Sequence, residues 1–122
     1  MNDEVVLEIV GGQQLVATIT RDSSTSLGLA VGVEAFALIK ASSVIVATEL
    51  GDVKLSARNC LSGKVSRVQP GAVNTEVSIE LPGGGTIAAI VTKDSSDALA
   101  LAVGTEASAI FKASSVIIGT PA

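Results

Sequence analysis

The chain has 122 residues, a formal net charge of −4, one cysteine and no histidine. This composition excludes an internal disulfide, and it argues against a zinc or copper site and against a basic nucleic-acid surface. No apolar run reaches the roughly 18 residues of a membrane span, so we expect a cytoplasmic protein with neither membrane nor nucleic-acid partners. The mean hydropathy of +0.59 predicts apolar surface that is buried between subunits, as in a homo-oligomer.

An internal duplication dominates the chain. Residues 2–50 align without a gap with residues 74–122, with 26 identities over 49 positions. Residues 51–73 precede the second copy, and nothing equivalent precedes the first. The repeat therefore predicts two modules, residues 1–50 without a first strand and residues 51–122 complete.

The first copy has the alternation of β-strands, broken by one short helix. Paired glycines at Gly11 and Gly12 predict a hairpin. Asp22 or Ser23 is expected to cap a helix that runs through Leu29 and is closed by Gly32. The predicted strands are 5–10, 15–21, 33–40 and 44–48.

The leader, residues 51–73, is expected to contain the first strand of the second module, which has no counterpart before the first copy. Residues 61–68 alternate partly, as a strand does, and Lys64 and Arg67 are expected on its solvated face. Residues 69–72 have the Pro-Gly order that a type II turn prefers, and Cys60 is expected to be a small buried apolar residue.

The second copy repeats the same order, with predicted strands at 77–81, 87–93, 105–112 and 116–120. Asp94 or Ser95 is expected to cap its helix, and Gly104 to close it. Five strands with one short helix between the third and fourth describe an all-β fold of small five-stranded barrels of the oligonucleotide-binding type.

One motif returns unchanged in both copies, as Lys40-Ala41-Ser42-Ser43 and Lys112-Ala113-Ser114-Ser115. Lysine supplies a charge, serine a hydroxyl donor, and alanine allows close approach, so the motif suits a small oxyanion. The alternative is a solvated turn between two strands.

The chain resembles the molbindins, the Mop-domain molybdate-binding proteins, of the tandem kind. The resemblance rests on residues 55–59, 71–77, 89–92 and 112–114. It implies OB-like barrels that assemble about a threefold axis, as a trimer or a multiple of it. It also implies molybdate, or tungstate as an analogue, bound between modules and subunits.

The resemblance further implies which residues bind the oxyanion. These fall in four segments: Ser56, Ala57, Arg58 and Asn59; Lys40, Ala41 and Ser42; Lys112, Ala113 and Ser114; and Gly71, Ala72, Val73 and Asn74. In the first copy the leader segment is missing and only Asn2 of the turn remains. Each assignment has an alternative. Arg58 could instead form an ion pair with one of the acids, and Asn59 and Asn74 could instead have a purely structural role in turns.

We expect molybdate storage or buffering rather than catalysis, because no nucleophile–base pair is evident. The alternative function is a detached regulatory or oligomerisation domain of a molybdate-responsive regulator or importer ATPase. The first module has three ways to complete its barrel. The leader serves both modules, a neighbouring chain lends a strand, or the first module stays open and packs its gap against another subunit.

Overall fold

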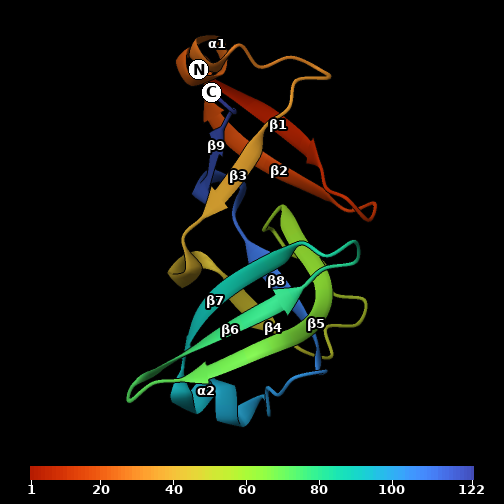
Figure 1. Cartoon of the computed structure of the whole chain (residues 1–122), viewed down its shortest axis with the longest axis vertical. Helices are drawn as coiled ribbons and strands as arrows, with labels where there is room; N and C mark the ends of the chain where they lie inside the picture. The colour runs from red at the N-terminus through yellow and green to blue at the C-terminus, as the bar shows by residue number, and fades with distance from the viewer.

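A computed structural model describes all residues 1–122 and shows two stacked bodies, with both termini at the first of them (Figure 1). The first body contains β1 (Asn2–Glu8), β2 (Gln14–Thr20), α1 (Arg21–Leu27), β3 (Phe36–Ile39) and β9 (Val116–Gly119). The second body contains β4 (Ile45–Ala47), β5 (Asn59–Pro70), β6 (Asn74–Glu80), β7 (Thr86–Thr92), α2 (Lys93–Ala98) and β8 (Glu106–Phe111). The expected all-β class with one short helix in each half is confirmed. Neither helix is long and apolar enough to cross a membrane.

The second body is a five-stranded antiparallel sheet in the order β4-β8-β5-β6-β7. Its central strand is β5, in which Leu61 and Val65 point into the core and are 3% and 1% exposed. The sheet bends at a β-bulge between Val65 and Arg67. Gly63 is required nearby, since a Cβ at this position would lie 2.2 Å from the carbonyl oxygen of Glu80.

The two bodies exchange their last strands. β4, from the first copy, pairs with β8 in the second body. β9, from the second copy, pairs with β3 in the first body. The sheet pairings therefore cross the boundary at residues 50 and 51, and one continuous hydrophobic core runs through both bodies.

In the first body β1 pairs with β2 alone, and no strand of this chain lies along its other edge. β5 pairs with β8 over Asn59–Lys64 and with β6 over Lys64–Pro70, and it reaches the first body through the side-chain hydrogen bonds of Asn59 and Gln13 rather than through a ladder. Within this chain the leader strand β5 forms no ladder with a strand of the first body, and the arrangements that involve a second chain stay predictions. Val5 and Leu7 are only partly buried, whereas their counterparts Val77 and Ile79 are 0% exposed.

Both helices begin two residues earlier than a cap at Asp22 or Asp94 requires, and three earlier than a cap at Ser23 or Ser95 requires, so the predicted caps are wrong. Thr20 and Thr92 are the caps, and their hydroxyl oxygens accept hydrogen bonds from the backbone N–H groups of Ser23 and Ser95. The predicted closing glycines, at 32 and 104, also lie beyond the helix ends. A threonine that ends a strand already has the extended backbone that an N-cap needs, so the strand leads directly into the helix.

Two predictions for the leader are wrong. Cys60 is exposed, because it alternates with the inward-facing Leu61 along β5. No type II turn forms at Pro70, because β5 continues through that residue and Gly71 does not adopt a positive φ. Lys64 and Arg67 lie on the exposed face, as predicted.

Candidate functional site

Both copies of the repeated motif form a single 3-10 turn where the chain crosses between the bodies. These turns are η1 (Ala41–Ser43) and η2 (Ala113–Ser115). Lys40 and Lys112 precede the turns, and their carbonyl oxygens accept hydrogen bonds from backbone N–H groups within them, at 2.8 Å and 3.0 Å. The backbone thus holds each turn closed without using a serine hydroxyl.

The donor side chains of the two turns remain available. Lys40, Ser42, Lys112 and Ser114 are all exposed, while Ala113 is buried. No serine hydroxyl in η1 or η2 takes part in a hydrogen bond within the chain. Each turn therefore offers one ammonium group and hydroxyl donors, with no carboxylate in the turn itself.

The exchanged strands bring the two turns together. Ile39 lies opposite Val116, so the next residue, Lys40, adjoins the end of η2. Ile45 lies opposite Ile110, so Lys112 adjoins the end of η1. Each turn also packs on the other body, η1 against β7 and η2 against β2. We call this region the junction, defined by residues 40–43 and 112–115.

The leader motif reaches the same region. Asn59 begins β5 opposite Phe111 of β8, which places Arg58 beside Lys112 at the ends of these two strands. Three of the four segments expected to bind an oxyanion therefore meet at the junction, although they are far apart in sequence.

Arg58 is engaged by an acid in this chain. Its guanidinium donates to both carboxylate oxygens of Glu4 on β1, with Nη1 to Oε2 at 2.7 Å and Nη2 to Oε1 at 3.1 Å. The hydrogen bond from Arg58, and then its charge, lower the pKa of the Glu4 carboxyl below its ordinary value. The pair is therefore present at neutral pH and is lost as the pH falls through that lowered pKa.

The two lysines of the junction have no such partner. The structure contains two ion pairs, Arg21 with Asp3 and Arg58 with Glu4. Neither Lys40 nor Lys112 belongs to one of them. Two exposed cations near an acid-bound arginine form a local positive region on a chain whose net charge is −4.

Asn59 has a structural role in this chain. It is 1% exposed, and both polar atoms of its side-chain amide are hydrogen-bonded. Its Nδ2 donates to the Val16 carbonyl at 2.7 Å, and its Oδ1 accepts from the Val16 N–H at 2.8 Å. This paired contact mimics a β-bridge and ties the start of β5 to β2 of the other body. The side chain of Asn59 is consequently not available to an anion.

The fourth expected segment lies apart from the junction. Residues 71–74 form the turn between β5 and β6, at the opposite end of β5 from Asn59. The Gly71 N–H donates to the Asn74 carbonyl at 2.8 Å, and the Lys93 N–H donates to the Val73 carbonyl at 3.0 Å. All four residues of the turn are exposed. A single chain thus presents two separate candidate regions.

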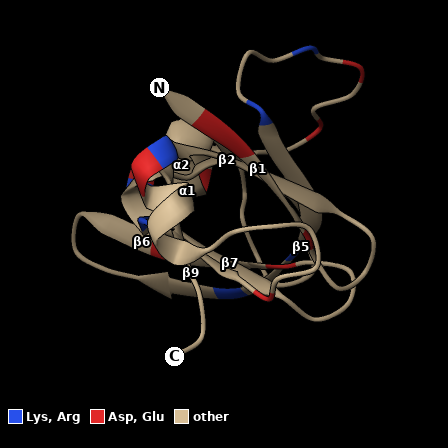
Figure 2. Ribbon diagram, turned by 90° about the horizontal axis from the view of Figure 1, so that it is seen from above, with Lys and Arg blue, Asp and Glu red and all other residues tan.

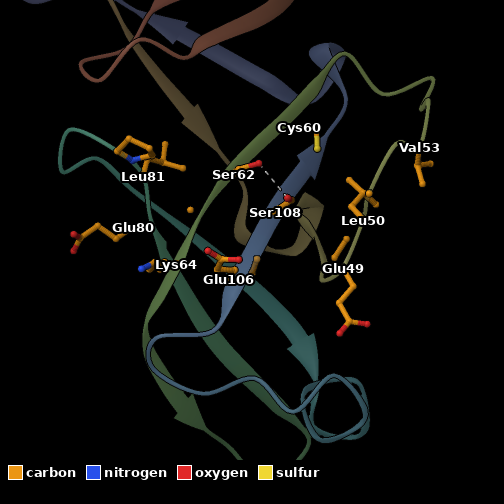
Figure 3. A pocket seen from close by; sticks show the side chains of 15 residues that line it. Glu49, Leu50, Val53, Cys60, Ser62, Lys64, Glu80, Leu81, Glu106 and Ser108 are labelled. Carbon is orange, nitrogen blue, oxygen red and sulfur yellow. Dashed lines mark hydrogen bonds between the residues drawn. The ribbon is translucent and has the colours of Figure 1, made fainter.

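A cavity of about 820 Å³ lies between residues 47–53 and the outer face of β5 and β8 (Figure 3). Glu49, Glu80 and Glu106 line it beside a single cation, Lys64. An excess of carboxylates repels an anion, so this cavity is not the oxyanion site. The chain also has no cluster of three His, Cys, Asp or Glu side chains that could hold a metal ion.

Sequence reasoning did not identify Glu4 as the partner of Arg58. The two residues are 54 positions apart, and β1 reaches Arg58 only because the bodies stack as they do. The duplication singles out Glu4 only in part. Glu4 is identical to its counterpart Glu76, but this identity does not indicate which residue Glu4 contacts.

The chain matches the model of the TOBE domain family over residues 2–46 and 55–118. It is 47% identical over 121 residues to the molybdenum-pterin-binding protein MopA of Rhodobacter capsulatus, covering 99% of this chain and 46% of MopA. It is 46% identical over 115 residues to the molybdenum transport protein ModE of Herbaspirillum seropedicae, covering 94% of this chain and 43% of ModE. The chain therefore spans less than half the length of these relatives.

A solved structure is also similar over nearly the whole chain. The cytoplasmic molybdate-binding protein ModG, solved with molybdate bound, superimposes with a TM-score of 0.94 at 45% sequence identity. The match covers 98% of this chain and 85% of that one. The strand order and the two-body arrangement described above are thus those of a known fold.

Proposed function

Because the chain belongs to the TOBE domain family, we propose that it binds molybdate, with tungstate as an analogue, and stores or buffers this oxyanion in the cytoplasm. The observation that carries the proposal is the meeting of three donor-rich segments at the junction. ModG, which is similar over 98% of this chain, is a molybdate-binding protein.

The chemistry of the junction suits a tetrahedral dianion. Molybdate has four acceptor oxygens, so a selective site offers donors and excludes carboxylates. Lys40 and Lys112 supply charge, and the hydroxyls of Ser42, Ser56 and Ser114 supply neutral donors. Backbone N–H groups beside Ala41 and Ala113 can donate because the small side chains allow close approach. Each charge-assisted hydrogen bond contributes about 1.5–3 kcal/mol, so four or five support roughly micromolar binding after association costs.

The turn at residues 71–74 is a second part of this proposal. The backbone N–H groups and small side chains of Gly71 and Ala72 suit an anion held between chains, and Val73 and Asn74 border them. This region lies too far along β5 to share one ion with the junction of the same chain. It would act where a second copy supplies the remaining donors.

We expect molybdate and tungstate to bind much more tightly than sulfate, which is smaller. The measurement is calorimetric titration of the full chain with the three anions in the same buffer. Equal heats from all three, or no heat from any, would contradict the proposed function.

Substitution of Glu4 by glutamine is expected to raise the affinity for molybdate a few-fold. At neutral pH the ionised Glu4 holds the guanidinium of Arg58, and an arriving dianion has to displace it. Glutamine removes the competing charge and leaves the side-chain length unchanged. Glu76→Gln, at the equivalent position of the second copy, is the matched control and should leave the affinity unchanged.

We propose that the chain assembles into a homo-oligomer, a trimer or a multiple of it, with sites between subunits. Exposed apolar side chains support assembly: Leu38 and Ile117 are 56% and 65% exposed on the paired strands β3 and β9. Light scattering at micromolar concentration measures the mass with and without molybdate. A stable monomer that still binds molybdate would contradict sites between subunits.

The second candidate function is regulatory. The chain covers only 43% of ModE, so the same pair of bodies occurs there within a longer protein. A sensor or oligomerisation domain would change its assembly or its contacts when the anion binds. A storage protein would bind several anions without a change in mass, so light scattering during the titration separates the two functions.

A further inference from the structure

The linker between the two copies, residues 48–58, is an irregular segment on the outer face of the second body, and we call it the strap. It leaves the end of β4 and enters the start of β5, and β8 lies between these two strands in the sheet. Within the strap only Arg58 makes a hydrogen bond, to Glu4. Figure 2 shows the strap as the loop of acidic and basic residues that extends from the start of β5. The strap is therefore attached at its ends and by no hydrogen bond in between.

The strap is longer than its path requires. Two strand spacings separate β4 from β5, about 10 Å, and the offset from Ser108 to Phe111 along β8 adds about 10 Å at right angles. A chain of the strap's length extends to more than roughly 30 Å. Glu49 and Gly51 have φ of 53° and 61°, in the left-handed region, so the chain bends sharply near the start of the strap. This slack allows the strap to swing without moving either strand.

The strap also borders a space that it does not fill. The cavity of about 820 Å³ lies between the strap and the outer face of β5 and β8. Leu50 and Val53 line the cavity on the strap side, and Cys60 and Ser62 line it on the sheet side (Figure 3). Val53 is 55% exposed in this position. Movement of the strap onto the sheet would bury this apolar surface, so a closed position is favoured by the hydrophobic effect.

The same strap carries donors of the proposed anion site at its other end. Ser56 and Arg58 belong to the leader motif, and Arg58 lies beside Lys112 at the junction. An anion held there by these donors fixes the last residues of the strap. Closing a free segment costs conformational entropy, and a segment that is already fixed at one end has less entropy to lose. Anion binding therefore lowers the cost of closing the strap.

We propose that the strap is an anion-controlled cover: molybdate bound at the junction closes residues 48–55 over the cavity on the outer face of the second body. The inference rests on the proposed function, because the anion is what fixes the end of the strap. On closing, Leu50 and Val53 leave the solvent and Cys60, which is now exposed, becomes covered. Occupancy of the anion site thereby changes a second surface of the protein, while both sheets stay as they are.

The first test is cleavage at Lys54, an exposed residue of the strap, by a lysine-specific protease that does not cut after Arg58. We expect saturating molybdate to slow the appearance of fragments 1–54 and 55–122 by about ten-fold, within the usual range of coupling between two sites. Sulfate at the same concentration should not slow it. Lys54→Arg is the matched control for the position of the cut and should abolish these fragments with and without molybdate.

The second test is the alkylation of Cys60 by iodoacetamide. We expect molybdate to slow this reaction by about five-fold, because the closed strap covers the thiol. A variant with both Leu50→Ser and Val53→Ser separates closure from direct shielding by the anion. It lacks the apolar side chains that favour closure, so it should still bind molybdate, but its Cys60 should react equally fast with and without the anion.

Calorimetric titration of the same samples distinguishes the failure of this inference from the failure of the proposed function. Bound molybdate that leaves either the cleavage rate at Lys54 or the alkylation rate of Cys60 unchanged would overturn the closing strap and leave the proposed function standing. So would protection of Cys60 that persists in the double serine variant, because the anion itself would then shield the thiol. Absence of any molybdate binding would overturn both.

Discussion

Replacing Asn59 by alanine is expected to lower the free energy of unfolding by about 2–3 kcal/mol. The substitution removes both hydrogen bonds between the Asn59 amide and the backbone of Val16, at 2.7 Å and 2.8 Å. It leaves a backbone N–H and a carbonyl without partners in a partly buried position, where water replaces them poorly. Urea unfolding followed by circular dichroism measures the change.

Gln13→Ala is the matched control for this prediction. The side chain of Gln13 makes the same kind of paired contact, from the first body to the backbone of Ser62 in β5, with both bonds at 3.1 Å. These bonds are exposed, so their loss should change the free energy of unfolding by no more than about 0.5 kcal/mol. Equal effects of the two substitutions would show that the burial of Asn59 does not strengthen its contact.

The strands were predictable because their signals are local. Alternation along residues 5–10 and 61–68, and the glycines of the hairpins, depend on near neighbours in sequence. The position of Cys60 was also predictable in principle, since Leu61 faces the core and adjacent residues of a strand face opposite ways. Cysteine is often buried as a residue type, but the alternation of β5 places Cys60 on the exposed face.

The strand exchange was not predictable in the same way. The turn at residues 41–43 has the same sequence as the turn at residues 113–115, and such a turn is compatible with a strand that returns to its own body. The choice depends on the packing of both bodies together, including β4 against β8. The duplication therefore predicted which residues are equivalent but not which body each strand joins.

The candidate site was predicted as separate segments. The motifs identified the residue types that an oxyanion needs, but their meeting depends on the registers of β3 with β9 and of β5 with β8. The partners of Asn59 and Arg58 depend on contacts that are 43 and 54 positions apart in sequence. The residue types of a site can be predicted from short sequence motifs. The ion pair in which Glu4 competes with an anion for Arg58 cannot, because it depends on how the two bodies pack.

Replacing Lys112 by alanine is expected to weaken molybdate binding by about 1.5–3 kcal/mol, roughly ten- to a hundred-fold. Lys112 lies at the junction beside Arg58 and beside the end of η1, and it belongs to no ion pair. Its ammonium group is exposed, so folding should change little. Arg58→Ala should lose a similar amount of binding, reduced by the gain from no longer having to break the pair with Glu4.

Arg67→Ala is the matched control for charge, because Arg67 is exposed on β5 away from the junction and donates to Gln69. It changes the net charge of the chain by the same amount and should leave the molybdate affinity unchanged. Lys40→Ala tests the other half of the junction, where no leader segment adjoins, and we expect a smaller loss than for Lys112→Ala. Calorimetric titration of the four variants gives the comparison. If Lys112→Ala and Arg67→Ala bind molybdate equally well, Lys112 is a solvated side chain and the anion binds elsewhere.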